Sequence, residues 1–133
     1  MSSIFTKIIN QEIPCHKVAE TEDYLAFLDI NPLVMGHVLC IPKKEVDYIF
    51  DLEDDMYSRL ALFAKKVARA IDATIPCERV GVAVVGLEVP HAHIHLIPIH
   101  DAGDVSFANP KLKLAPERMA EIAKTISDAF QVS

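Results

Sequence analysis

The stretch His91-Ala92-His93-Ile94-His95-Leu96-Ile97-Pro98 alternates imidazole side chains with apolar ones and then continues as an apolar run. Such alternation is typical of a β-strand, in which successive side chains point to opposite faces of the sheet. We therefore predict a strand over Val89–Ile99. The three histidines would share one face, and the residues between them would be buried against a helix on the other.

Apolar runs bounded by turn-forming residues predict four further strands. These are Val18–Ala19, Tyr24–Leu28, His37–Ile41 and Val80–Val85. Apolar residues at three- and four-residue spacing predict a long helix over about residues 52–73, with Asp51 as its N-cap. A second helix is expected after Pro116, and residues 102–114 read as a loop. Together these elements predict an α+β fold with about five antiparallel strands, one long helix and a C-terminal helix.

Composition narrows the class of protein. A chain of 133 residues with 51% hydrophobic residues predicts one domain over residues 1–133. The formal net charge of -6 argues against a protein that coats nucleic acid. No apolar stretch approaches the roughly 18 residues of a membrane span. Three scattered cysteines without a C-x-x-C pair favour a reducing, cytoplasmic location over a disulfide scaffold.

Three histidines at strict alternation are the strongest chemical signal in the chain. Because the ordinary histidine pKa lies near neutrality, each ring can serve as base, acid or nucleophile. Two interpretations follow from the residues alone. The three imidazoles could hold Zn²⁺ and leave an open position for water. Alternatively, they could form a metal-free cluster that acts on a phosphorus centre. His16 and His100 are interpreted as ordinary polar residues.

The pattern His-x-His-x-His followed by apolar residues resembles the histidine triad family of nucleotide hydrolases and transferases. Other segments are similar to that family in the same order: Ile4–Ile9, Glu12–Pro14, Ala26–Pro32 and Gly36–Lys44. The likeness is greatest to the small Hint-like branch. It implies the family's fold and a two-fold homodimer. Leu62 and Ala61 widen the apolar face of the long helix in a way that is compatible with a dimer surface.

The resemblance also implies a role for each matching residue. His93 would attack the α-phosphorus of a nucleotide and form a nucleotidyl-histidine, which water would then hydrolyse. His91 and His95 would flank it, and His37 would support the triad from the neighbouring strand. The nucleotide-binding residues would be Asp29 for the ribose hydroxyls, Phe5, Ile8, Phe27 and Ile30 around the base, and Gly86 and Glu88 in the phosphate loop.

The chain departs from the family in three places. Many relatives hold a structural zinc through a C-x-x-C pair and later histidines, but here Ser3, Thr6 and Glu45 stand at those positions. We therefore expect no metal there. Leu87 and Glu88 replace a glutamine and a hydroxyl residue of the phosphate loop, and a carboxylate would repel a phosphate. The stretch from Asp101 onward also diverges, which leaves leaving-group specificity open.

The predicted function is that of a nucleotide hydrolase or transferase, similar to a nucleoside phosphoramidase, that needs no cofactor. It would cleave an ester, amide or anhydride of a nucleoside monophosphate of the AMP or GMP type at the α-phosphorus. Phosphoramidates or aminoacyl-adenylates would suit Glu88 better than long polyphosphates, because its carboxylate could meet a cationic leaving group. Two alternatives remain at this point. One is a nucleotide-binding regulatory protein with weak or lost catalysis, and the other is a zinc-binding protein that uses the three histidines as ligands.

Overall fold

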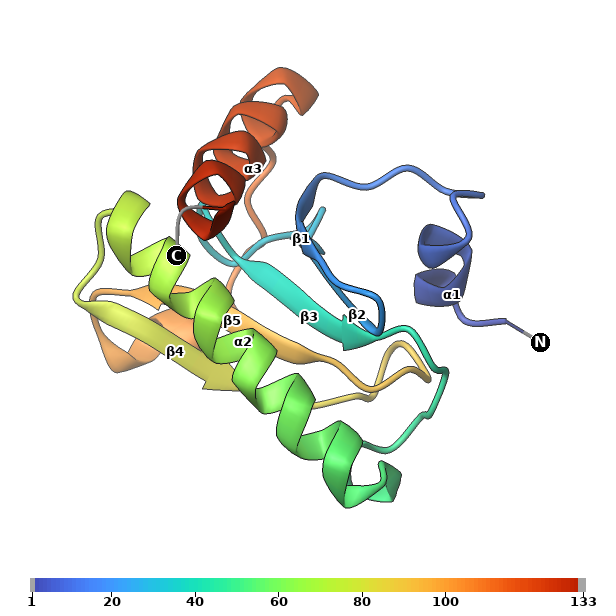
Figure 1. Cartoon of the computed structure of the whole chain (residues 1–133). Coiled ribbons are helices and arrows are strands. Elements are labelled where there is room, and N and C mark those ends of the chain that lie inside the picture. Colours follow the sequence, from blue (N-terminus) through green and yellow to red (C-terminus); the bar gives the residue numbers. More distant parts are fainter. Residues whose placement is uncertain (1, 132–133) are drawn as a thin grey trace.

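The computed structural model of the chain describes residues 2–131. One antiparallel sheet has the strand order β1-β2-β3-β5-β4 (Figure 1). Its strands are β1 (Lys17–Glu20), β2 (Tyr24–Leu28), β3 (Val38–Pro42), β4 (Arg79–Ala83) and β5 (Ile94–Ile99). The helices are α1 (Ile4–Ile9), α2 (Asp54–Thr74) and α3 (Pro116–Gln131), with 3-10 turns at Ile49–Asp51 and Ala102–Val105. The predicted α+β fold with five antiparallel strands is confirmed.

Both faces of the two central strands are buried, and each face has its own apolar cluster. Side chains from α2 and α3 pack on one face of the sheet, where they meet Ala26, Cys40 and Leu96. The alternate residues of the same strands, among them Phe27 and Leu39, form a smaller cluster with α1. Side chains of a strand alternate between the two faces of the sheet, and both faces are covered here. Every residue of β2 and β3 is therefore buried.

The strand that carries the histidines is shorter than predicted. β5 begins at Ile94, not at Val89, because the chain just before it is bonded differently. The amide of His91 donates to the carbonyl of Val89 at 2.8 Å, and the amide of Ala92 donates to the carbonyl of Val46 at 2.7 Å. Pro90 has no N–H to offer to a neighbouring strand. The predicted burial still holds in part, because Ala92 lies in the same cluster as Ile94.

Two other boundaries differ from the prediction at strand and helix ends. β4 ends at Ala83, and Val84 and Val85 are exposed in a loop that turns at Gly86, where φ is +74°. α2 begins at Asp54 with Glu53 at the N-cap, whereas Asp51 belongs to the preceding 3-10 turn. A pair of acidic residues in the first turn still faces the positive end of the helix dipole.

Sequence periodicity did not predict α1. This helix has only six residues, too few for a periodic apolar face. It is fixed by its N-cap, where the Ser3 side chain accepts a hydrogen bond from the amide of Thr6 at 3.0 Å. In the described part of the chain, no helix combines the length and the apolar character needed to cross a membrane.

Candidate functional site

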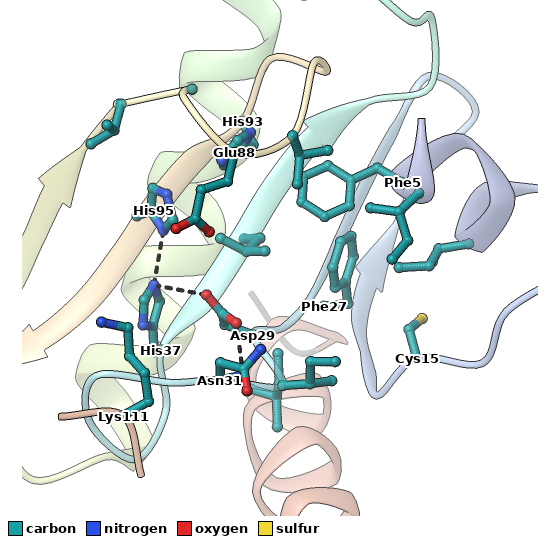
Figure 2. Close-up of a pocket in the computed structure, with 18 of the residues that line it drawn as sticks. Phe5, Cys15, Phe27, Asp29, Asn31, His37, Glu88, His93, His95 and Lys111 are labelled. Carbon is teal, nitrogen blue, oxygen red and sulfur yellow. Dashed lines mark hydrogen bonds and ion pairs between the residues drawn. The ribbon is translucent and has the colours of Figure 1, made fainter. Parts of the chain in front are cut away.

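A pocket of about 420 Å³ lies beside α1, the ends of β2 and β3, the loop before β5 and the segment around residues 107–111 (Figure 2). Its volume falls in the range typical of small-ligand sites. The sequence-predicted residues that line it are Phe5, Ile8, Phe27, Asp29, Ile30, His37, Gly86, Glu88, His93 and His95. The fold therefore brings together residues from five separate segments. His91 is the one predicted site residue that does not line the pocket.

The pocket has an apolar side and a polar side. On the apolar side the rings of Phe5 and Phe27 meet edge to face with centroids 5.4 Å apart. The polar side holds Asp29, His37 and His95 (Figure 2). Phe5 also stands perpendicular to the ring of His93, with centroids 5.1 Å apart. A flat apolar group on one side and an anionic group on the other would both find suitable contacts here.

His91 is fully buried, and both of its ring nitrogens are engaged away from the pocket. Nε2 lies 2.8 Å from the carbonyl oxygen of Pro42, which can only accept, so Nε2 carries the proton. Burial lowers the pKa of His91, which keeps the ring neutral. Nδ1 is then an acceptor, and the hydroxyl of Ser3 donates to it at 2.8 Å. The His91 side chain is thus held in place from both ends.

His93 is oriented by a backbone carbonyl. Its Nδ1 lies 2.6 Å from the carbonyl oxygen of His91, so Nδ1 carries a proton. In the neutral ring the lone pair is therefore on Nε2. The ring is packed against Phe5 on one side and against His95, with centroids 4.9 Å apart, on the other. This tautomer makes Nε2 a nucleophile in a fixed orientation.

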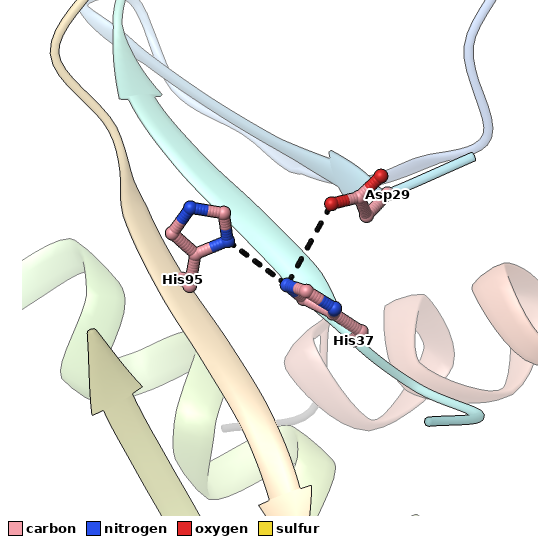
Figure 3. Close-up of side chains that lie close together, drawn as sticks. All are labelled: Asp29, His37 and His95. Carbon is pink, nitrogen blue, oxygen red and sulfur yellow. Dashed lines mark hydrogen bonds and ion pairs between the residues drawn. The ribbon is translucent and has the colours of Figure 1, made fainter. Parts of the chain in front are cut away.

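A hydrogen-bond relay fixes the tautomers of His37 and His95 (Figure 3). The amide of Leu33 donates to Nδ1 of His37 at 3.1 Å, so the proton of neutral His37 is on Nε2. That nitrogen lies 2.9 Å from Nδ1 of His95, which must accept. His95 consequently carries its proton on Nε2. Burial lowers the pKa of His37 to about 4 and that of His95 to about 3, so both rings are neutral near pH 7.

Asp29 completes this polar side. One carboxylate oxygen accepts from the amide of Asn31 at 2.9 Å, and the other lies 3.7 Å from Nε2 of His37. Burial raises the pKa of Asp29, and the negative charge of Glu88 contributes in the same direction. The carboxylate retains acceptor capacity for a ligand, because a carboxylate has about four acceptor positions.

The interpretation of the three histidines as zinc ligands does not fit this geometry. Within residues 2–131, the one group of potential metal ligands that converges is Asp29, His37 and His95. A metal at Nε2 of His37 would need the lone pair of that nitrogen. Nδ1 already accepts from the Leu33 amide, so in the neutral ring Nε2 carries the proton, which the metal would have to displace. The ring nitrogens of His91, His93 and His95 do not converge on a common point, since those of His91 are hydrogen-bonded to Ser3 and to the carbonyl of Pro42.

The residues at the positions of the family's structural zinc do come together, but as a hydrogen-bonded cluster. Oε1 of Glu45 accepts from the Ser3 amide and from the Thr6 hydroxyl, both at 2.6 Å. These bonds lower the pKa of Glu45. Zinc prefers thiolate, imidazole and carboxylate ligands, whereas two of these three side chains, those of Ser3 and Thr6, are hydroxyls that are already bonded. The residues do not fit a zinc ion, and the absence of metal here stays a prediction.

Sequence analysis missed two pocket residues from the segment after β5, Phe107 and Lys111. The ring of Phe107 packs edge-on against His95 with centroids 4.8 Å apart. The amide of Leu112 donates to the carbonyl of Pro32 at 2.8 Å and ties this segment to the pocket rim. The one available signal was a single aromatic residue, Phe107, in a stretch predicted as a loop, and no motif marks it.

Comparisons with known proteins show the family of the chain. The family model described as HIT domain matches residues 10–102. The adenosine 5′-monophosphoramidase hnt1 of Schizosaccharomyces pombe is 35% identical over 137 residues, which cover 98% of this chain and 100% of that protein. A HIT-like protein from Bartonella henselae superposes with a TM-score of 0.83 at 29% identity, covering 96% of each chain.

A zinc-bound histidine triad family protein from Mycobacterium smegmatis has a TM-score of 0.84 at 25% identity, and the match covers 99% of this chain and 95% of that one. The match to the HIT model spans more than half of the chain, and the sequence relationship to hnt1 extends over nearly its whole length. The chain therefore belongs to the HIT domain family.

Proposed function

We propose that this protein hydrolyses nucleoside monophosphate amides, of the AMP or GMP type, with His93 as the nucleophile. The family and the phosphoramidase relative support a nucleotide hydrolase. The observation that carries the proposal is the 2.6 Å contact between Nδ1 of His93 and the carbonyl of His91. It leaves the lone pair on Nε2 in a residue that lines the pocket.

In the first step, Nε2 of His93 forms a bond to the α-phosphorus as the P–N bond to a protonated leaving nitrogen breaks. The amine departs with the electron pair of that bond, and Nδ1 keeps its proton on the His91 carbonyl. In the second step a water oxygen bonds to phosphorus and the N–P pair returns to Nε2. A proton goes to solvent, and the nucleoside monophosphate is released. Dividing the displacement in this way lowers each barrier.

His95 would act as a hydrogen-bond donor in both steps. Its Nε2–H is directed by the relay from His37 and is available to a phosphate oxygen. A donor that is oriented before the reaction stabilises charge that develops on the phosphoryl oxygens. Since both rings are neutral near pH 7, the donor is a neutral N–H and needs no prior protonation.

The rest of the nucleotide has a matching place. Phe5 and Phe27 offer the apolar side for a purine, with Ile8 and Ile30 at its border. Asp29 would accept from the ribose hydroxyls, and its 3.7 Å separation from Nε2 of His37 supports this role because that oxygen has room for a closer donor. The ribose would then lie between the apolar side and the histidines, with the phosphate near His93 and His95.

Glu88 favours a particular leaving group. It lines the pocket, and its charge already acts on Asp29. A carboxylate there opposes a leaving group that carries further phosphates and favours a cationic one, such as a lysyl amine. We therefore place phosphoramidates and aminoacyl-adenylates above polyphosphates as substrates. The same carboxylate is the observation that favours the second candidate, a nucleotide-binding regulatory protein without turnover.

The test is to incubate adenosine 5′-phosphoramidate with the wild-type protein and with the His93→Ala variant in excess EDTA, and to follow AMP release. We expect release by the wild type alone, with AMP binding retained in the variant within a few-fold. Equal release by both proteins would overturn the assignment of His93. AMP binding by both without release would favour the regulatory protein, and loss of wild-type activity with EDTA would favour a zinc enzyme.

We also propose a cytoplasmic homodimer. The side chain of Leu62 on α2 is 62% exposed, and the exposed rings of Phe50 and Tyr57 lie 6.2 Å apart beside the start of that helix. Contiguous exposed apolar side chains are typical of interaction surfaces. A mass of two chains in solution, reduced to one chain in the Leu62→Glu variant, would support the dimer. A single-chain mass for the wild type would contradict it.

A further inference from the structure

The charges around the pocket are unbalanced for a ligand that contains phosphate. Glu88 and Asp29 contribute two carboxylates. Among the lining residues that the structure describes, Lys111 is the single lysine or arginine. A phosphate that approaches two carboxylates needs a cation close by, because repulsion between like charges is strong where water is partly excluded. Lys111 is placed to supply it.

The Lys111 side chain is exposed, but two backbone carbonyls hold it in a defined orientation. Its ammonium donates to the carbonyl of Phe107 at 2.7 Å and to that of Asn109 at 3.1 Å. An ammonium has three N–H donors, so one remains for a ligand. The surrounding segment is also anchored, since the Asn109 side chain donates to the carbonyl of Gly103 at 2.8 Å. Such ordering before binding reduces the entropy that a ligand contact would otherwise cost.

The orientation places the cation at the chemical side of the pocket. Figure 2 shows Lys111 beside His37, with Phe5 and Phe27 on the other side of the pocket. The carbonyl of Phe107 accepts a hydrogen bond from the Lys111 ammonium, and the Phe107 ring packs against the ring of His95. The positive charge of Lys111 is also among the influences that lower the pKa of His37 and oppose the rise in that of Asp29. The base side has no such cation among its lining residues.

We propose that Lys111 binds the phosphate of the nucleotide substrate and offsets the repulsion from Glu88. This inference rests on the proposed function, because it assumes that the pocket takes a nucleotide. The third N–H of the ammonium forms a charge-assisted hydrogen bond to a non-bridging phosphate oxygen. The segment after β5 thereby supplies a positive charge to the phosphate site, where the loop between β4 and β5 carries the uncharged Leu87 and the acidic Glu88.

The experiment compares the binding of AMP with that of adenosine, by titration calorimetry at low ionic strength. The variants are Lys111→Met, which keeps a long unbranched side chain without the charge, and Lys111→Arg, which keeps the charge. Lys113→Met is the matched control, because Lys113 is exposed two residues away and does not line the pocket. Binding is measured rather than turnover, so the result does not depend on catalysis by His93.

We expect Lys111→Met to weaken AMP binding roughly ten-fold or more and adenosine binding less than two-fold, since a hydrogen bond between charged groups is lost. Lys111→Arg should recover part of the AMP affinity, and Lys113→Met should change neither ligand. Equal losses for both ligands would show that Lys111 only orders the segment, which would overturn the proposal. So would wild-type protein that binds AMP no more tightly than adenosine. If Lys111→Met selectively loses AMP binding while the wild type shows no turnover, the proposed hydrolase activity is refuted and the proposed role of Lys111 is retained.

Discussion

The carbonyl oxygen of His91 lies 2.6 Å from Nδ1 of His93, and this contact links the proposed nucleophile to the amino-terminal helix. The ring of the same His91 accepts from Ser3, which is also the N-cap of α1. Ser3 and Thr6 are in turn bonded to Glu45. The network runs from the buried Ser3 and His91 to the exposed Glu45, and its buried members are restricted to one orientation when all their partners are satisfied. The orientation of His93 therefore depends on a helix of six residues.

Replacing the cap residue should destabilise the protein. Ser3→Ala removes the short hydroxyl contact to Nδ1 of His91, leaving only the Thr6 hydroxyl at 3.4 Å, and it removes the side-chain cap of α1. We expect the free energy of unfolding to fall by roughly 1–3 kcal/mol, as measured by urea denaturation. Ser2→Ala is the control, because Ser2 is exposed. A Ser3→Ala protein as stable as the Ser2→Ala protein would mean that the His91 ring finds another donor at no cost.

Breaking the histidine relay should affect turnover more than binding. In His37→Asn, the donor to Nδ1 of His95 is lost, so His95 can move its proton to Nδ1 and withdraw the N–H at Nε2. We expect kcat for an AMP amide to fall roughly a hundred-fold, as for loss of one oriented donor, with KM within a few-fold. The control is His100→Asn, at an exposed position. A change confined to KM would instead place His37 in substrate binding.

The residues of the site could be predicted from the sequence more fully than their geometry. The alternation of histidines and apolar residues predicted which side chains face the helices, and Ala92 and Ile94 are indeed buried in the cluster with α2 and α3. It could not distinguish His91 from the other two histidines. That difference comes from the turn between Val89 and His91, which directs the His91 ring toward Ser3. The turn depends on contacts with residues far away in the chain, such as Val46.

The contribution of the segment after β5 was outside the reach of sequence patterns. Phe107 and Lys111 belong to no periodic element, and their place is set by backbone bonds across the fold, such as that from Leu112 to Pro32. The short helix α1 was missed for a related reason. Its stability comes from the cap and from burial of Phe5, both of which depend on tertiary contacts.

Stability should decrease as the pH falls through the range below the ordinary histidine pKa of about 6.5. Burial lowers the pKa of His37 to about 4 and that of His95 to about 3, so the unfolded chain binds protons that the folded protein does not. The slope is up to about 1.4 kcal/mol per pH unit for each proton. Stability is therefore fully present above pH 6.5 and declines toward pH 4.

Urea denaturation at pH 7.5, 6.5 and 5.5 measures this slope before most carboxylates titrate. His37→Asn removes one of the three buried rings whose pKa is lowered by burial (His37, His91 and His95), so its unfolding free energy should depend less steeply on pH over the same interval. An identical slope in the wild type and in the variant would contradict the assignment of the protons to His37. A wild-type stability that rises as the pH falls from 6.5 to 5.5 would contradict the sign for both histidines.

The role of Glu88 can be measured as a ratio of two substrates. One is an AMP amide whose leaving group carries an amine, and the other is an adenosine polyphosphate whose leaving group is anionic. Glu88→Ser removes a carboxylate that lines the pocket, so it should raise kcat/KM for the anionic leaving group and lower it for the cationic one. We expect the ratio of the two to change roughly ten-fold at low salt and less at high salt.

Glu12→Gln is the matched control for that ratio, because it removes an exposed carboxylate outside the pocket and changes the net charge equally. If Glu12→Gln shifts the ratio as much as Glu88→Ser, the effect comes from the overall charge of the protein and not from the pocket. If Glu88→Ser leaves the ratio unchanged, Glu88 faces away from the leaving group. Selectivity would then have to come from the other charged residues that line the pocket beside His37, which are Lys111 and Asp29.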